Sequence, residues 1–380
     1  MFVRVAQDVI DEALKGTEIA IETLHLIATG IQRNKHWYSL PRQTAKKLSG
    51  ILSDYEKRLF VSVDNNDTNS MSKCIGVELV VSFQKPDAQE GKTILWYNPK
   101  IIVTFEIFEE THVLCENLYD IEFYKNCLDF YRYNSGKDAH KKGDSKFLAR
   151  NGGGVTTAAV LKNEILRGEH LVLVISDSDY RFFDTEDKPG PLGDTATAIN
   201  AVVNDHPKGF HHHYTLKYHR EAENLIPFRI LDEISGPSRK QKDLLRGMGK
   251  DLRVFDFKEG LTYQDLYGPK IYDYWKRVLN GKKDISFRET IRPLGSTQTV
   301  EEYKKRLLEN KKQSGEASKP IFVGWGSSIL DTATTKLKRL KGKDRIKPND
   351  LTPLQYEEWM EIGKLLFNWT LVPENKKRYL

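Results

Sequence analysis

The chain has 380 residues, more than one ordinary domain holds, so we expect two or three domains. A hydrophobic content of 39% with 11% aromatic residues is enough for packed cores and excludes wholesale disorder. With 59 basic against 53 acidic residues the net charge is +6, which is compatible with nucleic-acid binding but does not establish it.

Residues 1–110 contain both helical and strand-like patterns. Apolar residues recur at helical spacing in three stretches, the last of which runs from Ala45 to Leu59. Runs of β-branched and aromatic residues between polar turns predict strands. We therefore expect an accessory α+β domain here. The predicted strands are Leu59–Val63, Val77–Phe83, Thr93–Tyr97 and Ile101–Phe108.

From about Thr111 short strands alternate with helices. The run Leu171–Ile175 is apolar throughout, as expected for a parallel strand buried on both faces. This order predicts an α/β fold, a doubly wound parallel sheet over residues 111–232, with sites outside the carboxyl ends of the strands. The other expected strands are His112–Cys115 and His212–Leu216, and the expected helices are Ile121–Tyr131, Gly154–Leu166, Asp194–Val203 and Arg220–Leu231.

Residues 233–380 are expected to form a mainly helical C-terminal region. The run Pro320–Leu330 predicts a strand and a turn. Trp359 and Trp369 lie on one amphipathic helix, where core packing is favoured over base stacking. The expected helices are Tyr272–Leu279, Val300–Leu308 and Tyr356–Trp369.

Carboxylates follow three predicted strands of the central region. Glu116 and Asp120 come after the first strand, Asp177 and Asp179 after the buried strand, and Glu223 after the last. Clustered at one sheet edge, such side chains repel one another, and a divalent cation usually offsets this repulsion. Two aspartates at i and i+2 can both reach one cation if the backbone stays extended. Each motif alone has a plain structural alternative, a helix cap or an acid that suits a helix dipole.

The order of these motifs resembles the Toprim domain, the metal-binding fold of topoisomerases, bacterial primases and overcoming-lysogenization-defect (OLD) nucleases. In that family a Glu ends the first strand and an acidic residue stands four positions later, a spacing that Glu116 and Asp120 hold. Asn117 stands where the family usually has glycine, and Asn tolerates the left-handed backbone that glycine would supply. The segment Glu221–Asn224 resembles the late OLD-type segment, with Glu223 favoured over Glu221 as a metal ligand. The resemblance covers about residues 111–232.

The resemblance implies a metal-dependent nuclease that binds Mg²⁺ or Mn²⁺ and cleaves phosphodiester bonds, with DNA favoured over RNA as substrate. It also implies a role in bacterial anti-phage defence beside a separate ATPase, since no Walker A sequence is present. The accessory domain of residues 1–110 suits oligomerisation or substrate docking, so a homo-oligomer is a further expectation. Lys217 or Arg220 would neutralise charge on the scissile phosphate. The implied metal ligands are Glu116, Asp120, Asp177, Asp179 and Glu223, and the implied catalytic residues are Glu116, Asp177, Asp179 and Lys217.

Two kinds of segment are expected to contact nucleic acid. Gly152 and Gly153 resemble the turn before the second Toprim helix, where backbone amides can bind a phosphate, but a flexible turn explains the glycines equally well. The stretch Lys336–Lys347 carries seven Lys or Arg against one Asp, and a solvated helix face is the alternative. The candidate contacts are Gly152, Gly153, Arg220, Lys336, Lys338, Arg339, Lys341 and Lys343.

Other readings stay open. A non-catalytic Toprim-fold protein that binds nucleic acid or a partner is the main alternative, favoured by Asn117. A Rossmann-type cofactor enzyme is disfavoured, because no GxGxxG motif occurs and a basic loop is expected before the glycines. The run His211–His213 cannot offer all three rings to one metal ion, since neighbours on a strand alternate faces. Three dispersed cysteines and the lack of an 18–20-residue apolar run lead us to expect a soluble, cytoplasmic protein without membrane contact.

Overall fold

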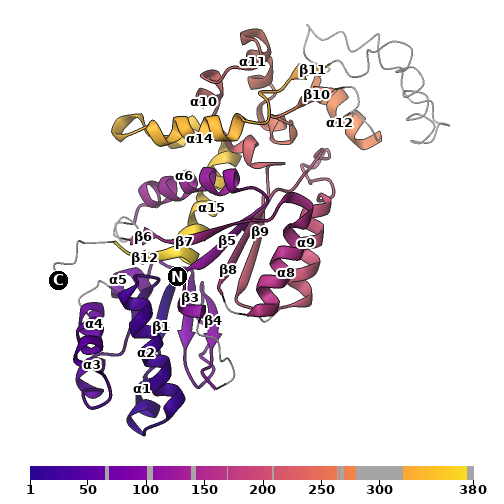
Figure 1. Cartoon of the computed structure of the whole chain (residues 1–380). Coiled ribbons are helices and arrows are strands. Elements are labelled where there is room, and N and C mark those ends of the chain that lie inside the picture. The colour runs from indigo at the N-terminus through magenta and orange to yellow at the C-terminus, as the bar shows by residue number, and fades with distance from the viewer. Residues whose placement is uncertain are drawn as a thin grey trace. The chain divides into compact units, whose positions relative to one another are not determined.

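The computed structural model of the chain describes residues 1–64, 68–100, 106–137, 143–168, 170–207, 209–262, 265, 269–279 and 320–374 (Figure 1). The chain divides into two compact units that are each discontinuous in sequence. The expected domain ranges 1–110, 111–232 and 233–380 stay a prediction. Unit 1 is Met1–Ile175, Ala198–Tyr214 and Trp359–Leu380, and unit 2 is Ser176–Thr197 and Thr215–Glu358.

Unit 1 begins with a four-stranded sheet in the order β2-β1-β3-β4. All three strand pairings are parallel, with Phe2 opposite both Trp37 and Glu78. The expected α+β arrangement of residues 1–110 is thus wrong, because a fully parallel sheet whose strands are interleaved with helices is an α/β layer. The strands are β1 (Phe2–Val5), β2 (Trp37–Ser39), β3 (Val77–Val81) and β4 (Thr93–Tyr97), and the helices are α1 (Gln7–Leu14), α2 (Glu18–Gln32), α3 (Thr44–Lys47), α4 (Asp54–Asp64) and α5 (Thr68–Ser72).

The predicted strand Leu59–Val63 belongs to helix α4 instead. Leu59, Phe60 and Val63 are buried, a spacing of one, three and four that fits one helix face and not an alternating strand. The expected helix Ala45–Leu59 is two helices, because a capping box of Ser53 and Glu56 starts α4 afresh. Most of the predicted strand Ile101–Phe108 lies outside the described residues, and its end forms a short 3₁₀ helix, η1 (Glu106–Phe108).

The central sheet of the chain has the order β7-β5-β8-β9. β5 pairs parallel with both neighbours, and Val113 lies opposite Ala149 on one side and Leu173 on the other. The parallel α/β architecture expected for this region is therefore observed. The elements are β5 (Thr111–Cys115), α6 (Leu118–Asn134), β6 (Gly143–Ser145), β7 (Phe147–Asn151), η2 (Gly154–Thr156), α8 (Thr157–Arg167), β8 (Val172–Ser176), α9 (Asp194–Asp205) and β9 (His211–Thr215).

Strand β7 was expected to be a basic loop. It is an edge strand with no fully buried residue, so it lacks the apolar run that marks β8. The hydrophobic core on one face of the sheet joins β5 and β8 to α8 and α9, which lie side by side in Figure 1. Its buried members are Leu114, Leu161, Val172, Val174 and Ile199.

On α6 the aromatic residues pack against the last helix, α15 (Pro353–Thr370). The Trp359 ring meets Phe123 and Phe130 edge to face, with ring centroids 5.7 and 5.4 Å apart. Trp359 and Trp369 are both buried, which confirms core packing for this pair. Strand β12 (Leu371–Pro373) then pairs antiparallel with β6.

The segment Arg220–Leu231 does not form the single continuous helix that was predicted. It is divided into a 3₁₀ helix, η3 (Ala222–Leu225), and a short helix, α10 (Phe228–Asp232). Pro227 separates the two, because proline has no N–H to donate and disfavours helical backbone in the residue before it. Ile226 is accordingly extended, with ψ 123°.

The rest of unit 2 combines short helices with an antiparallel pair, β10 and β11. Phe255 meets Phe257 and Phe322 edge to face in its core. The predicted helix Val300–Leu308 lies outside the described residues. Within the described ranges no helix is long and apolar enough to cross a bilayer. The elements are α11 (Arg239–Arg246), η4 (Gly249–Val254), β10 (Gly260–Thr262), α12 (Pro269–Leu279), β11 (Pro320–Val323), α14 (Ile329–Arg339), η6 (Gly342–Asp344) and η7 (Pro348–Asp350).

Candidate functional site

The loop after β8 is fastened to the loop after β9 by hydrogen bonds within unit 2. The backbone N–H groups of Ser178 and Asp179 both donate to the carbonyl oxygen of Arg220, at 3.0 Å each. The Ala222 N–H donates to Oδ1 of Asp177 at 3.0 Å. These bonds set the aspartates of the first loop against the glutamates of the second, which sequence spacing alone does not reveal.

Asp179 departs from the extended backbone assumed for the Asp-Ser-Asp motif. Its φ is +54°, in the left-handed region that non-glycine residues rarely adopt. The Gly193 N–H donates to the Ser178 carbonyl at 2.9 Å, and a Cβ on Gly193 would lie 2.4 Å from the Cβ of Asp179. A tight turn that packs against Gly193 therefore orients Asp179. The argument that Asp177 and Asp179 point the same way from an extended backbone does not apply.

Asn224 fixes the glutamates of the second loop. Its Oδ1 accepts the Glu221 N–H at 2.9 Å, and its Nδ2 donates to the carbonyls of Leu252 and Phe255 at 2.9 and 2.8 Å. With all of these atoms buried, the amide side chain holds η3 in place. In the sequence Glu221–Asn224, the asparagine therefore has a structural role: its hydrogen bonds fix the backbone that carries the two glutamates.

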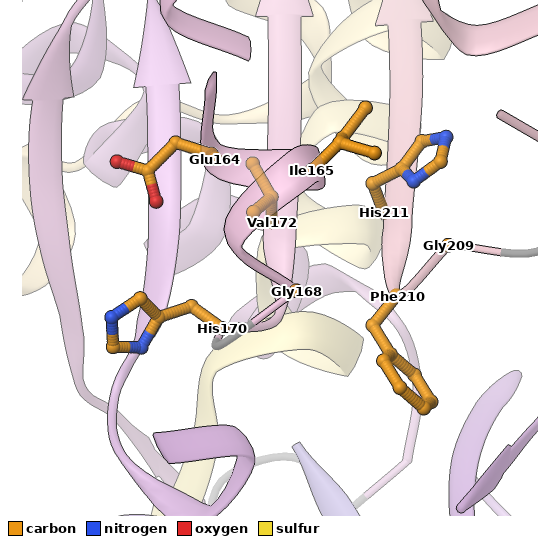
Figure 2. A pocket seen from close by; sticks show the side chains of 8 residues that line it. All are labelled: Glu164, Ile165, Gly168, His170, Val172, Gly209, Phe210 and His211. Carbon is orange, nitrogen blue, oxygen red and sulfur yellow. The ribbon is translucent and has the colours of Figure 1, made fainter. Parts of the chain in front are cut away.

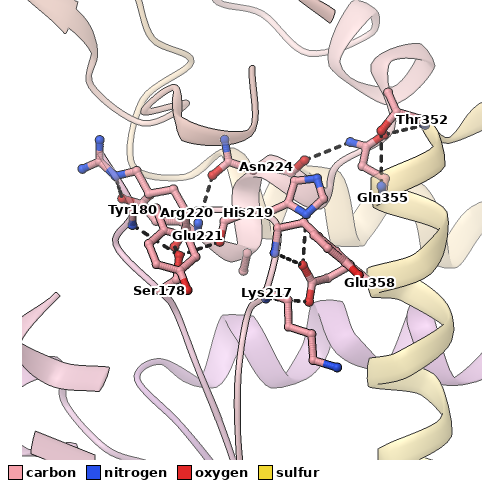
Figure 3. A network of polar contacts seen from close by, with 12 residues as sticks. Ser178, Tyr180, Lys217, His219, Arg220, Glu221, Asn224, Thr352, Gln355 and Glu358 are labelled. Atoms are coloured by element: carbon pink, nitrogen blue, oxygen red, sulfur yellow. Dashed lines mark hydrogen bonds and ion pairs between the residues drawn. The ribbon is translucent and has the colours of Figure 1, made fainter. Parts of the chain in front are cut away.

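Lys258 lies among these glutamates. Its Nζ is 3.1 Å from Oε1 of Glu223 and 3.6 Å from Oε2 of Glu221. Arg220 supplies a second cation, with Nε 2.9 Å from Oε1 of Glu221 and Nη2 3.1 Å from Oδ2 of Asp256. Figure 3 shows the Arg220–Glu221 pair beside Ser178. We call Asp177, Asp179, Glu221, Glu223 and Asp256 the acidic cluster.

Burial dominates the electrostatics of the acidic cluster. It raises the pKa of Glu221 to about 7, although the charges of Arg220 and Lys258 act in the opposite direction. Burial also raises the pKa of Glu223, although the charge of Lys258 acts to lower it. It raises the pKa of Asp179 in the same way, although Arg220 and Lys258 act to lower it. Burial alone would lower the pKa of Lys258, but Glu223, Glu221 and Asp177 outweigh it and raise that pKa. Burial thus makes these carboxyl groups costly to ionise, and a further cation bound beside them would stabilise their charged forms.

The donor set of the acidic cluster suits a hard divalent cation. All of its acidic side chains offer carboxylate oxygens, which Mg²⁺ and Mn²⁺ prefer. Oε2 of Glu223 is buried and has no hydrogen-bond partner among the described residues, so it is available to a ligand. In the described part of the chain, no three His, Cys, Asp or Glu side chains already stand in a metal-holding arrangement.

Glu116 and Asp120 lie in unit 1, at the start of α6. A capping box caps the N-terminus of this helix. Oδ1 of Asn117 accepts the Tyr119 N–H at 3.1 Å, and Oδ2 of Asp120 accepts the Asn117 N–H at 2.9 Å. Asn117 is extended, with φ −135°, so the left-handed turn expected there is wrong and Asn is favoured as an N-cap. Asp120 has a capping role, and metal binding by Glu116 and Asp120 stays a prediction.

The glycine turn packs against the end of β5. The Gly152 N–H donates to the Cys115 carbonyl at 2.7 Å, and the Gly153 N–H donates to the Glu116 carbonyl at 3.0 Å. A Cβ on Gly152 would lie 2.2 Å from the Thr157 hydroxyl oxygen, so this position requires glycine for close packing. Since both amides already donate within the chain, phosphate binding by Gly152 and Gly153 needs other groups of the turn and stays a prediction.

The predicted basic residues are distributed over unit 2. Lys217 is exposed, and in Figure 3 its side chain points away from the Arg220–Glu221 pair. Lys336 lies in the last turn of an amphipathic helix, α14, and its Nζ lies 3.2 Å from Oε2 of Glu233. Cations in the last turn of a helix also suit its dipole, which explains this stretch without nucleic-acid binding. Lys338 and Arg339 lie in the same turn of α14, and Lys341 and Lys343 lie at η6.

The three consecutive histidines face different surroundings in unit 1. His213 Nδ1 is 3.1 Å from Oδ1 of Asn200, His212 stacks on Trp369, and His211 lines a pocket of about 200 Å³ (Figure 2). The expectation that the three rings cannot share one ion is thus confirmed. The pocket is lined by Glu164, Ile165, Gly168, His170, Val172, Gly209, Phe210 and His211.

Sequence reasoning missed Lys258 and Asp256. They alternate with Phe255 and Phe257, which are buried, in a short run after η4. The alternation of apolar and charged residues in this run could have predicted that Asp256 and Lys258 share one face. Neither a family model, nor a curated protein, nor a solved structure matches this chain.

Proposed function

We propose that the chain is a Mg²⁺- or Mn²⁺-dependent nuclease with a Toprim-like fold. The observation that carries this proposal is the acidic cluster, in which buried carboxylates from two hydrogen-bonded loops surround Lys258. A divalent cation would stabilise the charged forms of these carboxylates, and Lys258 and Arg220 beside them suit the anionic phosphate of a nucleic acid.

The side chains have distinct roles in this proposal. Asp177, Asp179 and Glu223 of unit 2 hold the metal ion. When bound, such an ion makes a water nucleophilic and stabilises the leaving oxygen of the cleaved strand. Lys258 exchanges part of its contact with the glutamates for the scissile phosphate, and Arg220 keeps Glu221 oriented.

The test is cleavage of supercoiled plasmid and of tRNA by the purified protein, with Mg²⁺, with Mn²⁺ and with EDTA. The proposal expects nicking or linearisation of plasmid with either metal and none with EDTA. Digestion of tRNA alone would assign RNA as the substrate in place of DNA. Intact plasmid and tRNA under every metal condition would contradict the nuclease function.

A non-catalytic binding protein is the second candidate. It is favoured by the ion pairs of Lys258 and Arg220, which already neutralise part of the acidic cluster. Thermal melting with Mn²⁺ separates the two, because an ion that binds only the folded state raises the melting temperature. An unchanged melting temperature favours the binding protein.

The proposal also includes a setting taken from the Toprim resemblance, bacterial anti-phage defence with a separate ATPase partner. Self-association through the N-terminal domain is a further part of the proposal. Copurification with an ATPase encoded beside this protein tests the partner. Light scattering at several protein concentrations tests self-association.

A further inference from the structure

Glu358 is a buried carboxylate that lies outside the acidic cluster. Its exposed fraction is 0%, and it projects from the second turn of α15 (Figure 3). Oε1 accepts the Lys217 N–H at 3.0 Å, and Oε2 accepts the Tyr218 N–H at 2.9 Å. Oε2 also lies 3.2 Å from Nδ1 of His219. A carboxylate this deep in the protein is costly unless such donors surround it.

The three donors belong to the segment that leads from β9 into the acidic cluster. Beyond β9 these backbone N–H groups have no strand to pair with, so Glu358 takes the place of a neighbouring strand. One helical turn earlier, Gln355 Nε2 donates to the carbonyl of Asn224 at 2.9 Å. The start of α15 therefore fastens both ends of the segment Lys217–Asn224.

The fastened segment in turn holds the first acidic loop. The carbonyl of His219 accepts the Ser178 hydroxyl at 2.7 Å, and the carbonyl of Arg220 accepts the N–H groups of Ser178 and Asp179. The Ala222 N–H reaches Asp177. A continuous set of hydrogen bonds thus leads from Glu358 to the aspartates, although Glu358 touches none of them.

We infer that Glu358 is a positioning residue for the acidic cluster: it fixes the backbone at Lys217–His219, and this backbone fixes Asp177 and Asp179. Its effect on metal binding rests on the proposed function, but its effect on the two loops does not. Loss of Glu358 removes this carboxylate acceptor from the partly buried N–H groups of Lys217 and Tyr218 and releases both loops together.

Hydrogen exchange followed by mass spectrometry tests the structural part without metal. In Glu358→Gln the side-chain amide turns an NH₂ group toward the N–H donors, so we expect at least tenfold faster exchange in peptides covering 176–182 and 217–224. Glu358→Asp keeps the charge and both acceptor oxygens, and a smaller effect is expected. The control is Lys242→Met, which removes three hydrogen bonds from Lys242 to carbonyls of residues 231–234 elsewhere in unit 2. Faster exchange confined to residues 217–219 would overturn the inference.

Mn²⁺ titration followed by electron paramagnetic resonance tests the consequence. We expect Glu358→Gln to weaken Mn²⁺ binding at least tenfold, Glu358→Asp to restore part of it, and Lys242→Met to leave it unchanged. Unaltered Mn²⁺ affinity in Glu358→Gln would show a purely structural role and overturn the inference. If the wild-type protein binds no Mn²⁺, the proposed function fails, and the exchange experiment alone decides the role of Glu358.

Discussion

The Nζ atom of Lys258 lies 3.1 Å from Oε1 of Glu223, although the two residues are 35 positions apart. Glu223 is buried and Lys258 is partly exposed, and the carboxylate keeps its other oxygen without a hydrogen bond among the described residues. The cation therefore stabilises one side of the glutamate and leaves the other side for a ligand.

Replacing Lys258 tests the cation of the acidic cluster. Lys258→Met removes the charge that offsets burial at Glu223 and that faces the phosphate in the proposed reaction. We expect a lower melting temperature of the metal-free protein and about 100-fold slower cleavage, typical for loss of a preorganised charge-stabilising group. Lys250→Met is the matched control, since Lys250 is exposed and pairs with Asp187 at 3.2 Å. Equal cleavage rates in both variants would remove Lys258 from the site.

Asp177 can be tested by two substitutions with different consequences. Asp177→Asn keeps the acceptor for the Ala222 N–H and loses only the charge, so we expect unaltered stability and no cleavage. Asp177→Ala also orphans that N–H and should lower the free energy of unfolding by about 1–3 kcal/mol. Urea denaturation measures the difference. Relief of charge repulsion, which would make the Ala variant neutral or stabilising, is the competing result.

Asp177 and Asn117 illustrate how much of the structure can be predicted from the sequence. The apolar run before Asp177 was enough to predict a buried parallel strand and an acidic loop after it, because strand burial depends on local pattern. The pairing of Asp177 with Ala222, 45 positions later, depends on hydrogen bonds between loops that no spacing encodes. The same holds for Asn117, which was read as a substitute for glycine and is a helix cap. Lys258 was missed because its partners are distant in sequence.

His213 predicts a loss of stability in acid. Burial, with the charge of His212, lowers the pKa of His213 to about 4. The folded state therefore binds fewer protons than the unfolded chain, so the stability contributed by neutral His213 is complete above about pH 6.5 and declines toward pH 4. We expect His213→Gln to reduce the loss between pH 7.5 and 5 by about 1–2 kcal/mol, measured by urea denaturation. An identical pH dependence in both proteins would contradict this assignment.

The basic stretch at the end of α14 predicts a salt effect. If Lys338, Arg339, Lys341 and Lys343 contact phosphates, changing all four to Gln should weaken DNA binding for every sequence alike. Each lost contact should reduce the log–log salt slope by about 0.9. Mn²⁺ affinity should not change. Filter-binding titrations at several salt concentrations measure the slope, and a slope equal to that of the wild-type protein would leave the stretch as a solvated helix end.

The most direct test of the central claim is Mn²⁺-dependent plasmid cleavage by the wild-type protein and by Glu223→Gln, with the fold of each checked by melting. Gln keeps the size of the side chain and an oxygen for Lys258 but loses the charge that a metal ion needs. We predict cleavage by the wild-type protein that EDTA abolishes, and a rate at least 100-fold lower for the folded Glu223→Gln protein across the Mn²⁺ range. Equal cleavage by the two proteins would show that the acidic cluster is not the catalytic site.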